Sequence, residues 1–409
     1  MRFLFVSAQL PGHLDWGGYL ATAVALQQGG HDVLWVSGQA VASLVSQAGV
    51  PIQVVTETGW RWPPPPPRQP TADETPEAWQ RIRTERALDQ WLDQERVEQA
   101  CTELIEIGRA YQPHVIVSEM FVSAAGIAAE VLATPLVVAG WPAMQPKAVA
   151  GNQLLSNLAR ERLNRLCARF HIHGINWTAD GPPALLSPLL HLTYWHPRWY
   201  TGVTLLAQTH HVGGIAAKSR HSLPAWATTH PPDAKPWVLV TLGTSFGDDR
   251  NFFTAAAHAA DTLGCLPVLA LAGQLSLEQR RLLLERVPPT TVIDELIDLN
   301  AMLPHTAAAI HHGGAGVTHA LVTHAVPQIV VPHAADQAHQ AQGVLRSGVG
   351  LHLPAKETTI ARLVAALAQV LPDLSVYRAN AQTLRDEFAA LGGVSAAAER
   401  LVAVAKQGA

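Results

Sequence analysis

Charged residues, cysteines and long apolar runs are all scarce in this sequence of 409 residues. Charged residues make up only 15% of it, well below the roughly 25% of typical soluble domains. The formal net charge of -4 gives no basic surplus for binding nucleic acid. The three cysteines, Cys101, Cys167 and Cys265, are far apart and odd in number. They argue against a disulfide framework and a C-x-x-C zinc site, and they favour a reducing cytosol.

No stretch reaches the ~18 uninterrupted apolar residues that a membrane-spanning helix requires. The longest apolar stretch, residues 124–141, is interrupted by Glu130 and Pro135. The apolar run at the N-terminus is too short for a secretory signal. We therefore expect a cytoplasmic protein with no integral membrane contact. Its low charge leaves a lipophilic substrate or a peripheral membrane contact open.

Apolar residues are plentiful, at 48%, and the chain is long enough for two or three domains. Strand and helix patterns alternate twice, as is typical of βαβ units that build parallel sheets. Between the two series the alternation is lost, from residue 152 to about 236. The predicted strands cover residues 2–8, 31–37, 51–56, 114–119, 135–140, 237–242, 267–272, 291–295, 307–311 and 328–331. The predicted helices cover residues 19–28, 41–48, 76–111, 123–132, 154–170, 251–263, 277–285, 316–324, 360–370 and 377–406.

This order predicts an α/β protein with two doubly wound, Rossmann-like domains. The first domain is expected over residues 1–221 and the second over 237–409, joined by a proline-rich linker over 222–236. The last helix is a candidate to pack back on the first domain. Residues 63–67 are five consecutive prolines, which cannot lie inside a sheet because proline has no N–H to donate. We expect a stiff surface loop there, near the rim of the active site.

A glycine-rich turn lies between a predicted strand and a predicted helix in the second domain. Gly313, Gly314 and Gly316 allow the backbone to approach a ligand closely because they lack a Cβ atom. The unpaired N–H groups of the first helical turn favour an anion. The turn therefore predicts a phosphate or diphosphate site, to which His312 can add a side-chain donor. It matches neither a Walker A motif nor G-x-G-x-x-G, so we do not expect a nicotinamide cofactor.

Asp336 and Gln337 follow the next predicted strand and offer acceptors and donors suited to sugar hydroxyls. Thr244 and Ser245 follow the strand over 237–242, in a polar turn that also suits phosphates. Asp249 lies just beyond them in an Asp-Asp pair, which is more simply a helix N-cap than a metal site. No divalent metal is therefore predicted.

These motifs together resemble the donor-site signature of family 1 glycosyltransferases of the GT-B fold. The family includes bacterial antibiotic and lipid glycosyltransferases and plant UDP-glycosyltransferases. The similarity runs along the whole chain and is most specific in the C-terminal half. The matching segments are Gly12-His13, Val238–Gly243, Leu303-Pro304, His311–Gly316, Val326-Pro327-Gln328, Val331-Pro332 and Asp336-Gln337.

The resemblance implies two Rossmann-like domains facing across a cleft, and inverting, metal-independent transfer of a hexose from a UDP- or dTDP-sugar. That sugar nucleotide is a co-substrate, and no other cofactor is implied. Asp336 and Gln337 would bind the donor sugar. Val317 stands where the family usually has Ser or Thr, so either Thr318 substitutes or backbone N–H groups suffice. The implied diphosphate-binding residues are His312, Gly313, Gly314, Ala315, Gly316, Val317, Thr244 and Ser245.

On the acceptor side, His13 occupies the family's position for the general base. A histidine is suited to remove a proton from an alcohol near neutral pH. The resemblance implies that Glu119 orients this base, with Asp15 as a local alternative. Trp16 and Trp141 would line the pocket of a small hydroxylated acceptor, which aromatic walls suggest is lipophilic or aromatic.

Two other functions share this fold. One is a catalytically weak auxiliary protein that binds a sugar nucleotide, and the other is a sugar-nucleotide epimerase. The sequence leaves the sugar, the choice between uridine and thymidine, and the choice between monomer and homodimer open.

Overall fold

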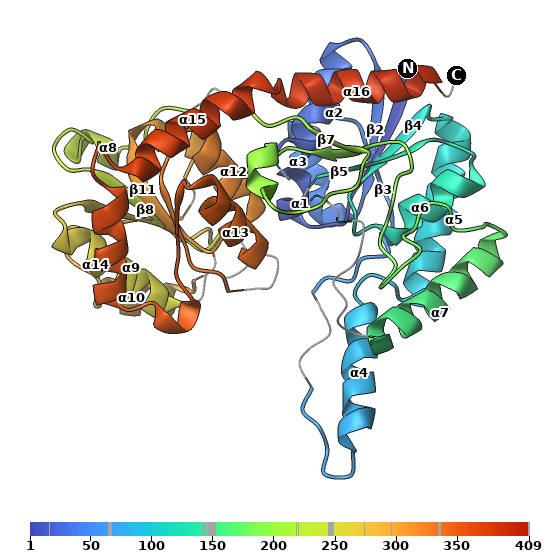
Figure 1. Ribbon diagram of the computed structural model, residues 1–409, viewed down its shortest axis with the longest axis horizontal. Coiled ribbons are helices and arrows are strands. Elements are labelled where there is room, and N and C mark those ends of the chain that lie inside the picture. Colours follow the sequence, from blue (N-terminus) through green and yellow to red (C-terminus); the bar gives the residue numbers. More distant parts are fainter. Residues whose placement is uncertain are drawn as a thin grey trace. The chain divides into compact units, whose positions relative to one another are not determined.

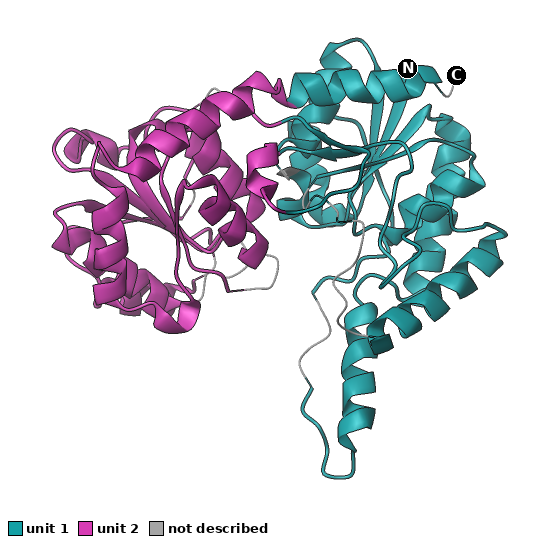
Figure 2. Cartoon of the chain, in the orientation of Figure 1, with its two compact units in different colours: residues 1–194, 203–212, 394–409 teal, residues 195–202, 213–393 magenta. Residues whose placement is uncertain are grey.

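The structure, a computed structural model, describes residues 1–15, 17–63, 68–140, 143, 145, 153–217, 219, 221–243, 249–273, 275–295, 297–333 and 337–407, without the Asp15 side chain. The chain divides into two compact units (Figure 2). Unit 1 contains Met1–Tyr194, Val203–Val212 and Val394–Ala409, and unit 2 contains Trp195–Gly202 and Gly213–Gly393.

Unit 1 is built on a parallel sheet of seven strands (Figure 1). In sheet order these are β3 (Ile52–Val54), β2 (Asp32–Ser37), β1 (Arg2–Val6), β4 (Val115–Ser118), β5 (Leu136–Ala139), β6 (His191–Thr193) and β7 (Thr209–His211). Phe3, Leu4 and Phe5 of the central strand β1 are fully buried. A strand that is covered on both faces needs such a continuous apolar run, so β1 was predictable from the sequence.

Helices of unit 1 cover this sheet. They are α1 (Pro11–Asp15), α2 (Tyr19–Gln28), η1 (Gln39–Val41), α3 (Ala42–Gln47), α4 (Pro76–Leu88), α5 (Gln94–Tyr111), α6 (Ser123–Val131), α7 (Gln153–Phe170) and α16 (Gly393–Gln407). The apolar side of α5, with Val97, Cys101 and Leu104, joins a core shared with β1, β4, α6 and α7. This core fixes the strand ends from which the first site is built.

Unit 2 repeats the architecture with a parallel sheet of six strands. In sheet order these are β10 (Val292–Asp294), β9 (Leu266–Ala270), β8 (Trp237–Thr241), β11 (Thr306–His311), β12 (Gln328–Val330) and β13 (Gly350–His352). Val238 and Val240 of β8 face a core that includes α9 and α14. Trp237 and Leu239 face a second core that includes α8 and α12. Alternate residues of a strand point to opposite faces, so the sheet is covered on both sides.

The remaining helices belong to unit 2. They are η2 (Pro197–Tyr200), α8 (Trp226–Thr229), α9 (Arg250–Thr262), α10 (Leu277–Leu284), α11 (Leu299–Met302), η3 (Leu303–His305), α12 (Ala315–Thr323), α13 (Gln337–Ser347), η4 (Ala355–Glu357), α14 (Ile360–Val370) and α15 (Val376–Ala390). Asp249 caps α9 by accepting a hydrogen bond from the Phe252 N–H, as the sequence predicts.

Several elements differ from the sequence-based expectation. The short strands β6 and β7 lie where alternation appeared lost, and α13 and β13 follow the predicted strand 328–331. The pattern over 76–111 forms two helices because Asp93 caps α5 at a new start. Residues 222–236, expected as a linker, belong to unit 2. So does η2, because the Trp199 ring lies on Gly343 of α13, where an added Cβ would come within 1.9 Å of it.

The C-terminal helical pattern also breaks into two helices, α15 and α16. α15 belongs to unit 2, whereas α16 belongs to unit 1 from Val394 onward. By length and composition, Val376–Gln407 is the one stretch of the described residues that could cross a membrane. Its apolar side chains are used in packing. Leu384 and Phe388 of α15 and Leu401 of α16 are fully buried.

Candidate active site

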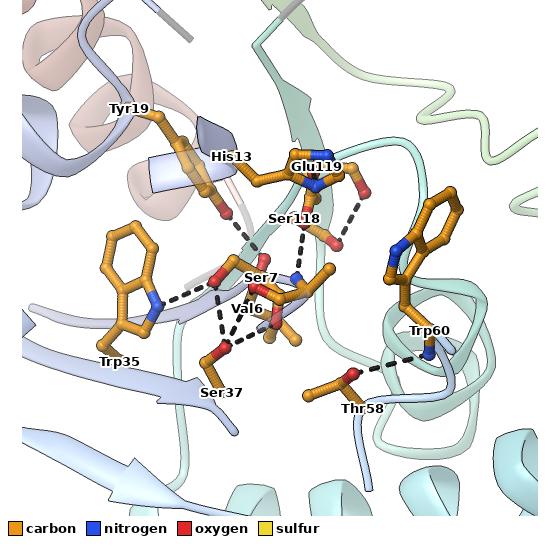
Figure 3. A network of polar contacts seen from close by, with 11 residues as sticks. Val6, Ser7, His13, Tyr19, Trp35, Ser37, Thr58, Trp60, Ser118 and Glu119 are labelled. Carbon is orange, nitrogen blue, oxygen red and sulfur yellow. Dashed lines mark hydrogen bonds and ion pairs between the residues drawn. The ribbon is translucent and has the colours of Figure 1, made fainter. Parts of the chain in front are cut away.

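His13 and Glu119 meet in unit 1, although 105 positions lie between them in the sequence. β1 and β4 are parallel neighbours, so their carboxyl ends lie at the same edge of the sheet. Glu119 directly follows β4, and His13 lies on α1, which follows β1. The His13 Nδ1 atom is 2.7 Å from Glu119 Oε2 (Figure 3). Glu119 is 1% exposed, which suits a carboxylate that orients a base rather than one that contacts solvent.

Hydrogen bonds hold the loop after β1 in place beneath this pair (Figure 3). The Ala8 N–H donates to the second oxygen of Glu119. Ser37 at the end of β2 donates to the Ser7 and Ala8 carbonyls, and the Tyr19 hydroxyl bridges the carbonyls of Val6 and Val117. Burial, and then the negative charge of Glu119, raise the pKa of Tyr19 well above its usual value, so this tyrosine stays a neutral donor.

Aromatic rings surround His13. Its ring centroid is 5.8 Å from Trp60 and 5.3 Å from Phe121, and those two rings pack edge to face at 5.1 Å. Trp60 is 8% exposed, and its indole N–H has no hydrogen-bond partner among the described residues. The loop over 59–70, which contains Trp60, was expected at the rim of the site. Phe121 was missed, and its only signal was its position two residues after Glu119.

A small cavity of about 10 Å³ lies at the carboxyl ends of β5 and β6, and Met120, the residue after Glu119, is part of its lining. Met120, Gly140 and His191 line it, together with Thr193 and Thr209. Neither buried threonine hydroxyl has a hydrogen-bond partner in the residues that the structure describes. A cavity of this size accommodates about one water-sized polar group. The hydroxyls of Thr193 and Thr209 could therefore bind a polar group of that size.

The glycine-rich turn of unit 2 connects β11 to α12. Gly313 has φ 93°, a left-handed conformation that favours glycine, and an added Cβ would come within 2.8 Å of the Val330 side chain. The Gly313 N–H donates to His311 Nδ1 at 3.1 Å. The Gly313 N–H is therefore not open to a ligand, although the sequence analysis placed Gly313 among the implied diphosphate-binding residues. Within the part of the chain that the structure describes, the N–H groups without a partner begin at Gly314, the N-cap of α12, and continue over 315–317.

The His312 ring lies in space between Gly243 and Gly314. An added Cβ would come within 2.4 Å of its ring at Gly314 and within 2.8 Å at Gly243. Burial, and then the charge of His333, lower the pKa of His312 to about 4, against a hydrogen bond with the Thr241 backbone. The ring is therefore neutral near pH 7 when no ligand is bound, and its single N–H faces the Thr241 backbone. Gly243 and Gly314 are required here for space around an imidazole.

Thr318 is one of the two alternatives that the sequence offers for the missing hydroxyl at position 317. It is fully buried, and its hydroxyl donates to the Gly314 carbonyl at 2.7 Å. The proton of this hydroxyl is thus used within the turn itself, which favours the second alternative, backbone N–H groups. Backbone N–H groups are what the turn presents at position 317.

His333 is a site candidate that the sequence analysis missed. Its Nδ1 lies 2.8 Å from the Val331 carbonyl and its Nε2 lies 3.3 Å from Asp249. Both partners are acceptors, so only the doubly protonated ring donates to both. Its backbone N–H donates to the Gln337 side-chain oxygen at 2.7 Å, and Gln337 is 2% exposed. This contact uses the side-chain oxygen of Gln337, a residue expected to bind the donor sugar.

Five predicted site residues lie outside the described residues. They are Trp16, Trp141, Thr244, Ser245 and Asp336. The same holds for the Asp15 side chain, the local alternative to Glu119, and for prolines 64–67. Their roles remain predictions.

Comparison with known proteins gives consistent matches. Residues 274–404 match the family model of the erythromycin biosynthesis protein CIII-like C-terminal domain. The L-demethylnoviosyl transferase of Streptomyces niveus is 36% identical over 186 residues, which cover 44% of this chain and 47% of the relative. The chain thus matches about half the length of this relative.

Solved structures match over nearly the whole chain. The kitacinnamycin glycotransferase has a TM-score of 0.77 at 19% identity, covering 98% of each chain. The glycosyltransferase VinC, in complex with dTDP, has a TM-score of 0.71 at 20% identity, covering 100% of each chain. The chain therefore has the GT-B fold of natural-product glycosyltransferases, and its residues 274–404 resemble the erythromycin CIII-like C-terminal domain in sequence.

Proposed function

We propose that this protein is an inverting glycosyltransferase that moves a hexose from a nucleoside diphosphate sugar to a hydroxyl of a small natural-product-like acceptor. The proposal uses His13 as general base and requires no metal. Relatives and fold neighbours that are named glycosyltransferases support the class of reaction. The contact between His13 and Glu119 is the observation that carries it, because a protein that only binds a sugar nucleotide does not need a buried carboxylate paired with a histidine.

In the proposed reaction, the oxygen of the acceptor hydroxyl forms a bond to the anomeric carbon, while the bond from that carbon to the diphosphate breaks. Attack opposite to the leaving group inverts the configuration. The hydroxyl proton passes to Nε2 of His13, since Nδ1 faces Glu119. The carboxylate then stabilises the imidazolium that forms. The walls made by Trp60 and Phe121 suit a lipophilic or aromatic acceptor beside the base.

The leaving diphosphate carries negative charge away from the sugar. The unpaired N–H groups of Gly314 and residues 315–317, at the positive end of α12, suit that charge. His312 would add a side-chain donor by taking up a second proton when the anionic diphosphate binds, because its one N–H in the neutral form faces the Thr241 backbone. Asp336 with Gln337 would hold the sugar. The dTDP found with VinC supports a thymidine diphosphate sugar as the first donor to test, with the uridine compound beside it.

The test compares wild type with His13→Ala. Release of dTDP or UDP is measured from a panel of sugar nucleotides, with and without hydroxylated aromatic and polyketide acceptors. We expect acceptor-dependent release in wild type and a loss of about a hundredfold or more in the variant, with unchanged dTDP affinity. Transfer by His13→Ala at near wild-type rate would remove the base assignment. Binding without turnover for any acceptor would favour the auxiliary protein, and interconversion of the sugar without an acceptor would favour the epimerase.

A further inference from the structure

His311, the residue before His312, is a fully buried histidine for which the proposed reaction has no use. It ends β11 directly beneath the glycine-rich turn. Its Nδ1 accepts the Gly313 N–H at 3.1 Å, and its Nε2 lies 3.1 Å from the side-chain oxygen of Gln328. Gln328, at the start of β12, is also fully buried, and its amide nitrogen lies 3.5 Å from the Thr318 carbonyl. One continuous chain of contacts therefore runs from Gly313 to the first turns of α12.

The partners of His311 select one protonation state. Because Nδ1 accepts from a backbone N–H, it carries no proton, so Nε2 must carry the proton and donate to Gln328. Burial, and then the neighbouring His312, lower the pKa of His311 to about 3. The ring is thus a neutral bridge of fixed polarity, a donor on one side and an acceptor on the other.

This bridge decides which N–H groups the turn presents. Gly313 adopts φ 93°, and His311 draws its N–H inward. Gly314 then starts α12 with φ -62° and ψ 140°, and Thr318 closes the turn from the other side through the Gly314 carbonyl. The N–H groups of Gly314 and residues 315–317 have no partner within the described chain. If the Gly313 N–H were released, the peptide between His312 and Gly313 could rotate and turn the His312 carbonyl toward the anion.

We propose that His311 and Gln328 are positioning residues that hold the glycine-rich turn in the one backbone conformation that binds a diphosphate. Neither residue touches the ligand. The proposal rests on the proposed function only in taking the turn as a diphosphate site. According to this proposal, part of the affinity for the donor comes from the buried pair His311 and Gln328, which lies behind the turn, and not only from residues that contact the donor.

The experiment measures the dissociation constants of dTDP and of thymidine by calorimetry. Thymidine lacks the diphosphate, so it reports on the rest of the nucleotide site. His311→Phe removes both hydrogen bonds, Gln328→Leu removes the partner of Nε2, and His311→Asn keeps an acceptor near the Nδ1 position. His191→Phe is the matched control, because His191 in unit 1 is also buried and accepts a backbone N–H, from Ser187 at 2.9 Å. Circular dichroism confirms that each variant is folded.

We expect His311→Phe and Gln328→Leu to weaken dTDP binding about tenfold or more, the size of a lost net hydrogen bond, and to change thymidine binding less than about twofold. His311→Asn should recover part of the dTDP affinity, and His191→Phe should leave both affinities unchanged despite a similar loss of thermal stability. Nitrogen NMR of the wild type should show a protonated Nε2 and an unprotonated Nδ1 in His311.

The proposal is overturned if folded His311→Phe or Gln328→Leu binds dTDP as wild type does, or loses dTDP and thymidine equally. If His311→Phe does not fold, Gln328→Leu and His311→Asn decide the matter by the same comparison. Failure of the wild type to bind any nucleoside diphosphate would instead refute the proposed function, so the two failures are distinguishable.

Discussion

Gly314→Ala is a sharp test of the diphosphate site, because it adds one methyl group in a place the structure defines. The Gly314 backbone, at φ -62° and ψ 140°, accepts alanine without strain. The new Cβ would lie 2.4 Å from His312 Nε2 and 2.8 Å from its Cε1. Carbon contacts are favourable at about 3.5–4.0 Å, so the ring must move by roughly 1 Å.

The ring has little space for that movement. Gly243 lies so near it that a Cβ there would come within 2.8 Å of Cε1, and a hydrogen bond joins the ring to the Thr241 backbone. Overpacking of this kind costs about 1–3 kcal/mol of stability. Displacing His312 from the diphosphate removes a hydrogen bond to a charged group, worth about 1.5–3 kcal/mol. We therefore expect dTDP binding to weaken by about 10–100-fold.

Calorimetry with dTDP and with thymidine measures this effect, and thermal unfolding measures the stability cost. Gly12→Ala is the control, because an added Cβ at Gly12 meets no atom within 4 Å. We expect Gly314→Ala to lose dTDP affinity selectively, with thymidine binding nearly unchanged. A variant that folds and binds dTDP within about twofold of wild type, well inside the expected 10–100-fold range, would show that His312 does not contact the phosphates.

Three further predictions test the rest of the proposal. Glu119→Gln should preserve the fold and dTDP affinity but lower kcat by about a hundredfold, because the amide no longer stabilises protonated His13; an unchanged kcat in steady-state assays would assign the carboxylate a structural role alone. Asp336→Ala should raise the dissociation constant of the sugar nucleotide more than that of dTDP, and an equal loss in calorimetry would remove Asp336 from the sugar site. Acid should destabilise the protein, since the pKa values of His311 and His312 are lowered to about 3 and about 4 against about 6.5 in the unfolded chain. The unfolded chain binds protons more tightly in that window, so the free energy of unfolding is highest above about pH 6.5 and falls by about 1.4 kcal/mol per pH unit for each ring as the pH decreases. Chemical denaturation between pH 7 and pH 4 measures this slope, which should decrease in His311→Phe.

Most strands of both sheets could be predicted from the sequence because parallel strands are buried on both faces and appear as apolar runs, as in Phe3–Val6. The three-residue strands β6 and β7 were missed, although the equally short β3, β10 and β12 were predicted. Both missed strands lie where the alternation of strand and helix patterns is lost, so tertiary pairing rather than local pattern makes them strands. The assignment of η2 to unit 2 depends on the fit of Trp199 against Gly343, and no local signal encodes such a contact.

The glycine-rich turn was predictable because its signals are local. Three glycines between a strand and a helix predict an anion site from a short stretch of sequence. The proximity of His13 to Glu119 was predicted only through family resemblance. The contacts of His333 with Asp249 and of Trp60 with Phe121 were not predicted at all. These pairs are distant in sequence, and side-chain packing alone brings them together.

By itself, the sequence determined that this chain forms two parallel α/β sheets and that one of its turns suits a diphosphate, because burial periodicity and glycine placement act over a few residues. The tertiary structure alone decided which N–H groups that turn offers. His311 and Gln328, on neighbouring strands, together hold Gly313 inward. A hydrogen bond across strands depends on register, and register is fixed only when the whole sheet has formed.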